Sequence, residues 1–539
     1  MNFILFRYWL HRLFPTAYRY KKGIVKFSQN SISYFYPKVF LDLKRLSNSR
    51  NTKKVQNKLK SNILFYAIRQ DQLHVVWDFI IAEALNLRGH NIKVIACDGL
   101  ISRACNEGWY PRLPKNLCKE CFKFARKFYK YAGFKVEFLG DYLSNGSAGN
   151  WLGSTELLEL LEAERVIEKL NFRDYKNFRY KGLNIGEIVQ VSVIHFLRVQ
   201  DIQTEVEKNL TSRQIYKNFM IGAVLMTDIC ATIIKRNKPK VIFMLNGKFM
   251  AERVMLELAK KENIRTVIFE TGLTPDTMVF LHNEPINYSN IGNWNLYKSI
   301  PLNEIQEKRL SDYLASRISG EGQTADYWKK LKDGKDTLYN SLKLENFNKT
   351  ALLFTNIVWD SALFDLTAYF DNPKSWLKST ISFFESHKNI GLIIRIHPAE
   401  IFWPGTYRDS LATWIKNTYG NNLPENVRLI KPEDTISSYA LMELCDVGIV
   451  TTSTTGLEMS VMNKPVIVND KAHYSNRGFT VDPNNEVEYH QVLTELLIEN
   501  KQAELDFKLA RRYAYYIFFE CSLGLNPLIL IIIVPYHLI

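Results

Sequence analysis

"VTTSTTGLEMSVMNKPVIVND", residues 450–470, is the stretch of the sequence that decides the fold. A predicted strand ends near Val450, hydroxyl residues follow, and "TGLEMSVMN" predicts a short helix before the next strand, "KPVIV". Earlier in the chain "GLIIRIHP", residues 391–398, ends another apolar strand with His-Pro. Both turns follow the carboxyl ends of strands, where open α/β sheets bind their ligands. The stretch therefore predicts a parallel sheet with a ligand site at its edge.

The same strand–helix–strand order recurs on both sides of a polar segment. Predicted strands of a first half are "NILFYAI", "NIKVIACDG", "PKVIFMLNG" and "IRTVIFETG". Those of a second half are "KTALLFTNIVW", "GLIIRIHP", "NVRLIKP", "CDVGIVTTS" and "KPVIV". Helical patterns lie between them, and parallel strands need such crossover connections. The sequence predicts an α/β protein with two doubly wound Rossmann-type domains that face each other across a cleft.

At 539 residues the chain is too long for one comfortable hydrophobic core. We expect an N-terminal extension at 1–60, a Rossmann-like domain at 61–300, a linker at 301–345, a second Rossmann-like domain at 346–500 and a closing helical and apolar segment at 501–539. The last segment contains the apolar run Leu528–Val534. This run is too short to span a bilayer, which takes about 20 residues. The sequence leaves open whether it packs on the body or touches lipid.

The N-terminal extension is strongly basic. Residues 1–60 hold fourteen Lys and Arg and one acid, so they carry +13 of the net charge of +15. Apolar residues recur at helical spacing at its start, at Phe3, Phe6, Leu10 and Leu13. Arg7 interrupts this run too early for a signal peptide or a spanning helix. An amphipathic helix with a basic stretch suits an anionic membrane surface; the alternative is a helix docked on the body with a solvated tail. No nucleic-acid-binding motif accompanies the charge, so we expect no nucleic-acid partner.

The turn after Val450 is a candidate phosphate site. Ser453, Thr454 and Thr455 offer hydroxyl donors where the predicted helix begins, and Gly456 lets the backbone approach a ligand closely. Glu458, one turn into the helix, could accept hydrogen bonds from the two hydroxyls of a ribose. The alternative is a plain N-cap with a capping-box acid, which needs no ligand.

The His-Pro turn offers a second contact for a phosphate. Pro398 holds the chain extended at the end of the strand, and His397 stands at the tip with Arg395 close by in sequence. An imidazole there can donate to a leaving phosphate as negative charge grows on it. The chain contains no Asp-x-Asp pair, which favours stabilisation by His, Arg and the helix dipole without a metal. We therefore expect that catalysis requires no cofactor.

"RIHP", "DVGIVTTSTTGLEMSVMNKPVIV" and "AHYSNRGFT" resemble the C-terminal domain of bacterial capsular and surface polysaccharide synthesis proteins. This group of GT-B-like glycosyltransferases includes the Kdo transferases. The resemblance implies that 346–500 binds a nucleotide-sugar donor, with His397 and Ser453 to Thr455 on its phosphate and Glu458 on its ribose. It also implies that 61–300 binds the acceptor.

The same resemblance implies a catalytic base in the first domain. Its members carry a carboxylate in an acid-rich turn after a strand; this chain has Glu-Thr-Gly there, so Glu270 would take the proton of the acceptor hydroxyl. The alternative is a helix-capping or salt-bridged glutamate. Further cleft candidates are Asn246 and Arg253 in "NGKFMAER", and Asn356 and Asp360 after the first strand of the second domain.

Four of the seven cysteines fall close together, at Cys97, Cys105, Cys118 and Cys121, the last two as C-x2-C. Four thiols can form a tetrahedral structural zinc site, which here would hold the loop at 98–117. The alternative is a set of buried or free thiols.

Together these features predict a metal-independent, inverting glycosyltransferase that moves a sugar from a nucleotide-sugar donor to a surface-polysaccharide or glycolipid acceptor. We expect it to be cytoplasmic and peripheral on the inner face of the cell membrane. Three alternatives stay open at this point: a non-hydrolysing sugar-nucleotide 2-epimerase, a teichoic-acid-type glycerophosphate transferase, and a non-catalytic nucleotide-binding component of polysaccharide export.

Overall fold

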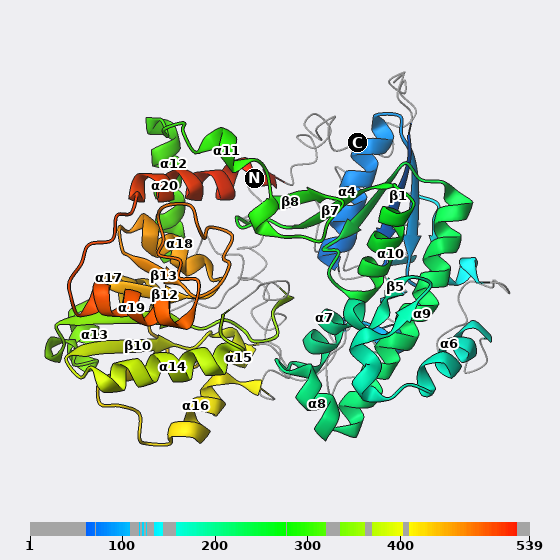
Figure 1. The fold of residues 1–539 in the computed structure, drawn as a ribbon. Helices are drawn as coiled ribbons and strands as arrows, with labels where there is room; N and C mark the ends of the chain where they lie inside the picture. Colours follow the sequence, from blue (N-terminus) through cyan, green and yellow to red (C-terminus); the bar gives the residue numbers. More distant parts are fainter. Residues whose placement is uncertain are drawn as a thin grey trace, which may run out of the picture.

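The computed structural model describes residues 61–69, 72–107, 118, 121–122, 125–126, 134–143, 158–275, 277–319, 335–361, 369–402 and 409–524. These residues form two α/β lobes that lie side by side (Figure 1). The predicted membrane-binding extension, 1–60, and the apolar run Leu528–Val534 lie outside the described residues.

The N-terminal lobe is built on a seven-stranded sheet of order β14-β8-β7-β6-β1-β2-β3. Its strands are β1 (Asn62–Ala67), β2 (Asn91–Ala96), β3 (Val136–Phe138), β6 (Val241–Leu245), β7 (Arg265–Thr271), β8 (Thr277–His282) and β14 (Leu523–Gly524). The five from β7 to β3 run parallel, and β8 and β14 are antiparallel additions at one edge. A separate small hairpin pairs β4 (Arg179–Tyr180) with β5 (Leu183–Asn184).

Helices cover both faces of this sheet, which explains why its strands read as continuous apolar runs. The helices of the lobe are α4 (Gln72–Leu87), α6 (Leu158–Glu168), α7 (Ile185–Leu197), α8 (Ile202–Lys208), α9 (Leu210–Asn237) and α10 (Met250–Lys261). Phe65 and Phe243 stack with ring centroids 4.9 Å apart on the face that packs against α4. Tyr66 and Met244 point to the opposite face, toward α9 and α10. Alternate side chains along β1 and β6 therefore pack into two hydrophobic cores, one on each face of the sheet.

One helix among the described residues, α9, is long and apolar enough to cross a membrane by length and composition. Of its apolar window, 72% is buried inside the protein. The helix packs against α7, α8 and α10, so its apolar character is accounted for by the core of the N-terminal lobe.

The C-terminal lobe contains an all-parallel five-stranded sheet of order β11-β10-β9-β12-β13. Its strands are β9 (Lys349–Phe354), β10 (Ile390–Arg395), β11 (Val427–Ile430), β12 (Val447–Val450) and β13 (Val466–Val468). Its helices are α14 (Pro373–Ser386), α15 (Ala399–Phe402), α16 (Leu411–Tyr419), α17 (Ser438–Leu444), α18 (Thr454–Val461) and α19 (Glu486–Leu497). The predicted α/β class with two doubly wound lobes is confirmed.

Short helices occupy the region between the two sheets in the sequence. They are α11 (Trp294–Tyr297), α12 (Glu304–Ile318) and α13 (Lys335–Ser341). The last two fall in the predicted linker at 301–345. Leu310 and Leu338 are buried in the core of the C-terminal lobe, and α12 packs against α20 (Phe507–Tyr515). These described parts of the segment therefore add helices to that lobe.

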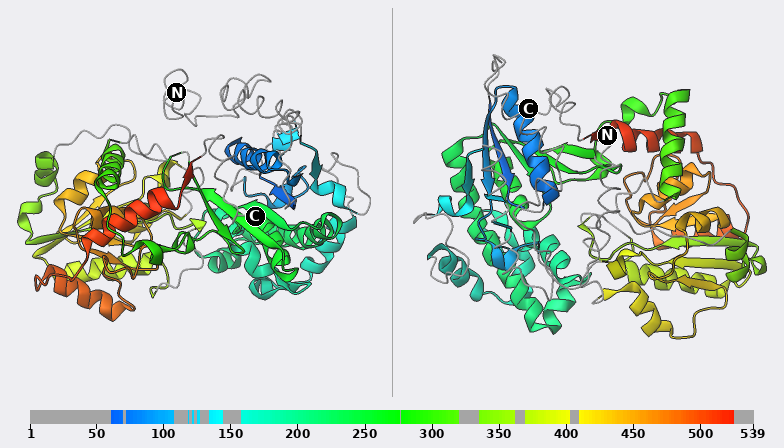
Figure 2. Two further views of the ribbon diagram at one scale, coloured as in Figure 1. Left: turned by 90° about the horizontal axis from the view of Figure 1, so that it is seen from above. Right: turned by 180° about the vertical axis from the view of Figure 1, so that it is seen from behind.

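The end of the described chain crosses from one lobe to the other. Helix α20 packs on α18 in the C-terminal lobe, a π-helical turn follows at Tyr516–Glu520, and β14 then pairs with β8 of the N-terminal sheet (Figures 1 and 2). Tyr516 Oη donates to the carbonyl of Ile291 at 3.0 Å and fastens the crossing to the segment before α11. We call residues 516–524 the crossing segment.

The central strand of the C-terminal sheet provides a test of the fold. Leu353 lies in β9 and is fully buried, so Leu353→Ala should lower the free energy of unfolding by about 2–5 kcal/mol through lost burial and a new cavity. Urea unfolding measures the change. Ile305→Ala is the control, because Ile305 is 80% exposed and should change stability by no more than about 0.5 kcal/mol. Equal losses for both variants would contradict the assigned packing.

Candidate active site

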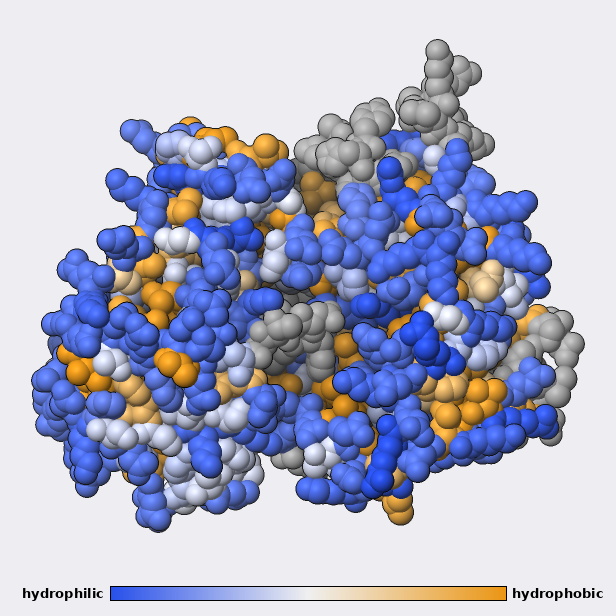
Figure 3. Space-filling view, in the orientation of Figure 1, coloured by the Kyte–Doolittle hydropathy of each residue, from blue (hydrophilic) through white to orange (hydrophobic). Residues whose placement is uncertain are grey.

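A cavity of about 240 Å³ lies where the two lobes meet. It is lined by Thr271, Gly272, Leu273 and Tyr288 from the N-terminal lobe and by Arg317, Thr454 and Phe518 from the C-terminal side. Thr271 ends β7 and Thr454 begins α18, which follows β12. The cavity is therefore reached from the carboxyl ends of strands in both sheets. Figure 3 shows the furrow that separates the lobes on the surface.

Glu270 is held in place at the carboxyl end of β7. Asn246 Nδ2 donates to Glu270 Oε2 at 2.6 Å, and the backbone N–H of Thr271 donates to Glu270 Oε1 at 2.8 Å. Asn246 follows β6 in a left-handed conformation with φ of 55°, which asparagine tolerates better than most residues. The structure thus brings together two residues that the sequence analysis selected separately, and fixes the orientation of the carboxylate. Glu270 itself is not among the residues that line the cavity, whereas the next residue, Thr271, is.

Tyr288 connects Glu270 with the other lobe. Its hydroxyl donates to the carbonyl of Thr271 at 2.5 Å, and its ring lines the cavity. Burial raises the pKa of Tyr288 far above its ordinary value, and the charges of Glu270 and Asp360 raise it further. The ring of Tyr288 also lies 6.3 Å, centroid to centroid, from that of His473 in the C-terminal lobe, so this tyrosine stands between the lobes.

Asn356 joins the carboxyl ends of two strands of the C-terminal sheet. Its Nδ2 donates to Thr452 Oγ1 at 2.9 Å, linking the turn after β9 to the turn after β12. Its Oδ1 is a buried acceptor that has no hydrogen-bond partner among the described residues. Nearby in sequence, the carbonyl of Ser361 accepts from Lys248 Nζ of the N-terminal lobe at 2.9 Å. Asn356 and Asp360 therefore both lie beside the junction of the lobes.

Trp359, which follows β9, anchors this junction. It is 6% exposed and makes an edge-to-face contact with His195, with ring centroids 5.3 Å apart. The guanidinium carbon of Arg198 lies 3.7 Å from the centre of its indole. Both partners belong to the end of α7 in the N-terminal lobe, so this tryptophan packs between lobes.

The predicted cleft residue Arg253 has a local partner instead. Arg253 Nε and Glu257 Oε1 form an ion pair at 2.9 Å, one turn apart on α10. Arg253 is not among the residues that line the inter-lobe cavity.

His397 lies at the end of β10 in a neutral state. Its backbone N–H donates to Thr355 Oγ1 at 3.0 Å, and its Nδ1 accepts from the backbone N–H of Ala399 at 3.1 Å. With Nδ1 accepting, the proton of the neutral ring is on Nε2. Burial, and then the charge of Arg395, lower the pKa of His397 to about 4. The imidazole can therefore act as a hydrogen-bond donor near neutral pH without carrying charge. His397 is not among the residues that line the inter-lobe cavity.

Arg395 has a structural role within the lobe. It is 2% exposed, and its Nη1 and Nη2 donate to the carbonyls of Lys431 at 2.5 Å and Asp434 at 3.2 Å. These bonds hold the turn after β11. Arg395 stands two residues before His397, so the sequence suggested that it binds a phosphate. The structure does not place Arg395 on the inter-lobe cavity.

The hydroxyl run at 453–455 mainly caps α18. Ser453 Oγ accepts from the backbone N–H of Thr455 at 3.3 Å and from Thr455 Oγ1 at 2.8 Å. A Cβ on Gly456 would overlap the hydroxyl of Tyr474, so packing against that ring requires a glycine here. Of the run, Thr454 is the residue that lines the cavity.

Glu458 is 3% exposed and already engaged. Its Oε1 pairs with Arg317 Nη2 at 2.7 Å, and its Oε2 accepts from the hydroxyl of Tyr439. Glu458 itself is not among the residues lining the cavity, whereas Arg317 is. The sequence analysis missed Arg317, because a basic residue in a polar helix carries no signal that it is buried against a carboxylate 141 positions away.

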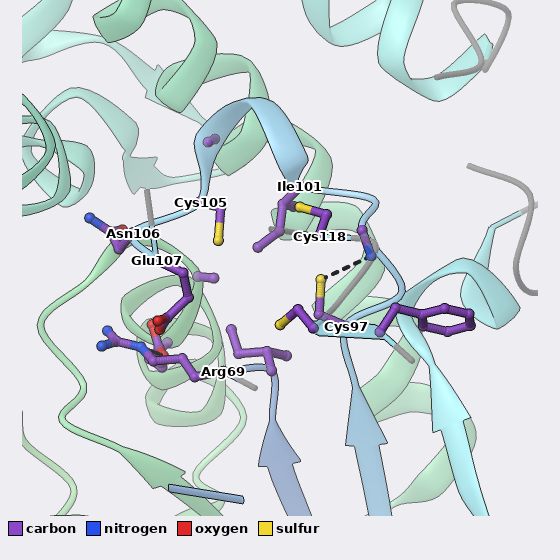
Figure 4. Close-up of a pocket in the computed structure, with 14 residues that line it drawn as sticks. Arg69, Cys97, Ile101, Cys105, Asn106, Glu107 and Cys118 are labelled. Carbon is purple, nitrogen blue, oxygen red and sulfur yellow. Dashed lines mark hydrogen bonds and ion pairs between the residues drawn. The ribbon is translucent and has the colours of Figure 1, made fainter. Parts of the chain in front are cut away.

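The four clustered cysteines converge on a second, smaller cavity of about 40 Å³ in the N-terminal lobe (Figure 4). Burial raises the pKa of Cys97 and of Cys118 to about 12, so these thiols are protonated near neutral pH. Within the part of the chain that the structure describes, no group of three or more His, Cys, Asp or Glu is arranged to hold a metal ion. Structural zinc stays a prediction.

Two parallel α/β lobes with a cavity at their facing edges define the GT-B class of fold, which glycosyltransferases and sugar-nucleotide epimerases share. Within that class, residues 297–519 match the family model described as "Capsule polysaccharide biosynthesis protein". The match covers the C-terminal lobe and confirms the family resemblance read from the sequence. No curated protein matches the chain.

Several solved structures share this general arrangement. The β-Kdo 2,4 transferase KpsC of Thermosulfurimonas dismutans is 14% identical, with 54% of this chain and 87% of that chain covered and a TM-score of 0.34. Its β-Kdo 2,7 transferase is also 14% identical, with coverages of 53% and 79% and a TM-score of 0.30. The UDP-GlcNAc 2-epimerase of Neisseria meningitidis is 11% identical, with coverages of 86% and 99% and a TM-score of 0.27.

The neutral state of His397 predicts a pH dependence of stability. Because its pKa is about 4 in the folded protein and about 6.5 in the unfolded chain, the unfolded chain binds more protons between these values. The contribution of His397 is therefore present above about pH 6.5 and is lost as the pH falls toward about 4. His397→Gln should show a shallower loss of unfolding free energy than the native protein over this range in urea titrations. Parallel pH profiles for the two proteins would contradict the buried, neutral imidazole.

Proposed function

We propose that the protein transfers a sugar from a nucleotide-sugar donor to a surface-polysaccharide or glycolipid acceptor. The observation that supports this best is the inter-lobe cavity, to which Thr271 brings the end of β7 and Thr454 the start of α18. In this proposal the C-terminal lobe binds the donor and the N-terminal lobe binds the acceptor. The sugar carbon that reacts then lies between them.

The carboxyl edge of the C-terminal sheet supplies the donor contacts. Thr454 stands at the start of α18, where the positive end of the helix dipole favours a phosphate. His397 donates from Nε2, and contacts along the edge link it to the same turn: His397 bonds Thr355, and the next residue, Asn356, bonds Thr452. Hydrogen bonds of this kind stabilise the negative charge that grows on a leaving phosphate.

Glu270 is the proposed base on the acceptor side. As the acceptor oxygen forms its bond to the anomeric carbon, the bond from that carbon to the donor phosphate breaks and the hydroxyl proton passes to the Glu270 carboxylate. Asn246 holds this carboxylate with a 2.6 Å hydrogen bond, which limits its rotation. A single displacement of this kind inverts the anomeric centre. No metal takes part in any of these steps.

Replacing the proposed base should lower the rate of sugar transfer and leave donor binding unchanged. Glu270→Gln keeps the size and one hydrogen-bonding oxygen but cannot take a proton, so the transfer rate should fall about 10²- to 10⁴-fold. Donor binding should persist, measured as the rise in melting temperature with CMP-, UDP-, GDP-, dTDP- or CDP-linked sugars. Glu262→Gln, at the exposed end of α10, is the matched control and should leave both readouts unchanged.

Two results would overturn the proposed function, and a third would overturn the assignment of its base. If none of these compounds raised the melting temperature of the native protein, the donor site would be wrong. If the native protein converted a nucleotide sugar without any acceptor, it would be an epimerase. If Glu270→Gln transferred sugar at the native rate, another group would be the base.

We also propose that the basic extension holds the enzyme at the inner face of the membrane, beside a lipid-linked acceptor. Its net charge of +13 supports this, since each basic residue near an anionic surface contributes about 1 kcal/mol. Replacing Lys53, Lys54, Lys58 and Lys60 together by Gln should therefore weaken sedimentation with phosphatidylserine vesicles by at least tenfold. Binding by the native protein should also weaken with salt and vanish on uncharged vesicles. Vesicle binding unchanged by the four substitutions would contradict this placement.

A further inference from the structure

Arg317 presents a charged group to the inter-lobe cavity. It lies in the last turn of α12, its side chain is 13% exposed, and it lines the cavity with Thr454. None of the seven lining residues is acidic. Leu273 and Phe518 form apolar wall on either side, and a charge in such surroundings is screened less than at an open surface.

Three side chains hold the guanidinium in one orientation. Its Nη2 donates to Glu458 Oε1 at 2.7 Å, its Nη1 to Tyr313 Oη at 3.1 Å and its Nε to Tyr439 Oη at 3.3 Å. Tyr439 also donates to the second oxygen of Glu458. Tyr313 in turn donates to the carbonyl of Leu273 at 3.1 Å, at the rim of the cavity in the N-terminal lobe. The position of Arg317 is therefore set from both lobes.

The ion pair fixes the charge state of the arginine. Burial is the largest single influence and lowers the pKa of Arg317, but Glu458, Tyr313 and Tyr439 together raise it by more, so the group stays protonated. Desolvating two charges is costly, and a pair like this is weak evidence for stability in itself. A buried pair that leaves one partner on a cavity wall is better explained by a ligand that needs the charge.

The arrangement also reassigns Glu458. Both of its oxygens are used, one by Arg317 and one by Tyr439, and its side chain does not reach the cavity lining. Arg317 stands between the carboxylate and the cavity. The group that meets a ligand there is the guanidinium, and a guanidinium fork matches two oxygens of a phosphate.

We propose that Arg317 binds the phosphate of the donor nucleotide and that Glu458 is a positioning residue that acts through Arg317. This inference rests on the proposed function, because it assumes that a nucleotide occupies the cavity. It differs from the sequence-based expectation that Glu458 binds the ribose hydroxyls directly.

The first test uses calorimetric titration of the full-length protein with CMP, UDP, GDP, dTDP and CDP. Arg317→Gln should weaken binding of the nucleotide that the native protein takes by about 10- to 100-fold, the loss expected for a hydrogen-bonded charge. Arg317→Lys should recover part of the affinity, because it keeps the charge and loses the fork. Arg309→Gln is the matched control: Arg309 lies two turns earlier on α12, against Phe519, and should bind as the native protein does.

The second test separates positioning from direct binding by a double-mutant cycle. If Glu458 acts through Arg317, then Glu458→Gln weakens nucleotide binding in the native background but adds nothing to Arg317→Gln. If Glu458 binds the ribose itself, the two losses add and this assignment is overturned. If Glu458→Gln fails to fold, Tyr439→Phe serves in its place. This substitution removes the hydroxyl that bonds both Glu458 and Arg317, and it leaves the carboxylate intact.

The outcomes distinguish the inference from the proposed function. Native protein that binds none of these five nucleotides overturns both. Native protein that binds one of them while Arg317→Gln binds it equally well overturns the role of Arg317 and leaves the nucleotide site in place. Melting temperatures of all variants, taken without nucleotide, identify any variant whose loss of binding reflects unfolding.

Discussion

Parallel strand pairing is the constraint on which this structure depends. Every strand of the C-terminal sheet, and the five from β7 to β3 of the N-terminal sheet, run parallel to their neighbours. The chain must return to the same end of the sheet after each strand, so all the carboxyl ends of a sheet share one edge. The turns after β7 and β12 thus meet at one cavity, while Lys248 after β6 reaches the carbonyl of Ser361 after β9 across the same junction of the lobes.

The geometry of that cavity is set by contacts that join the lobes. Trp359 packs between His195 and Arg198, and Lys248 reaches the carbonyl of Ser361. The crossing segment adds a second connection, and its Phe518 forms part of the cavity wall. Because the wall is made by a segment that belongs to both lobes, a change in their separation would alter the cavity directly.

Much of this architecture could be predicted from the sequence, because it depends on local patterns. The apolar strands, the helices between them and the turns at 395–398 and 450–458 are all encoded within short windows. Asn246 and Glu270 were each selected from their own turns, but their hydrogen bond depends on β6 and β7 being neighbours in the sheet, which the local pattern does not state. The two residues of β14 could not be predicted, because so short a strand is defined only by its partner β8.

The roles of the site residues could be predicted less well than the fold, because their side-chain partners are distant in sequence. Gly456 fits a phosphate turn by its type, but its contact with Tyr474 is a property of the packed lobe. The hydroxyl run predicted a phosphate site, yet Ser453 and Thr455 bond each other and leave Thr454 on the cavity. The sequence could indicate the edge where a ligand would bind, but not which members of the run would face it.

The two buried arginines of the C-terminal lobe show why proximity in sequence is a poor guide to a charged ligand site. Arg395 is two residues from His397, but its guanidinium is taken up by backbone carbonyls of a neighbouring turn, because a buried donor that ends a strand must find acceptors there. Arg317 comes from a helix outside the sheet and is held by a carboxylate and two tyrosines. Backbone carbonyls satisfy the donors of Arg395, whereas a carboxylate and two tyrosines hold the guanidinium of Arg317 in one orientation. Arg317 lines the inter-lobe cavity and Arg395 does not, and this difference in position is the reason for assigning the phosphate to Arg317.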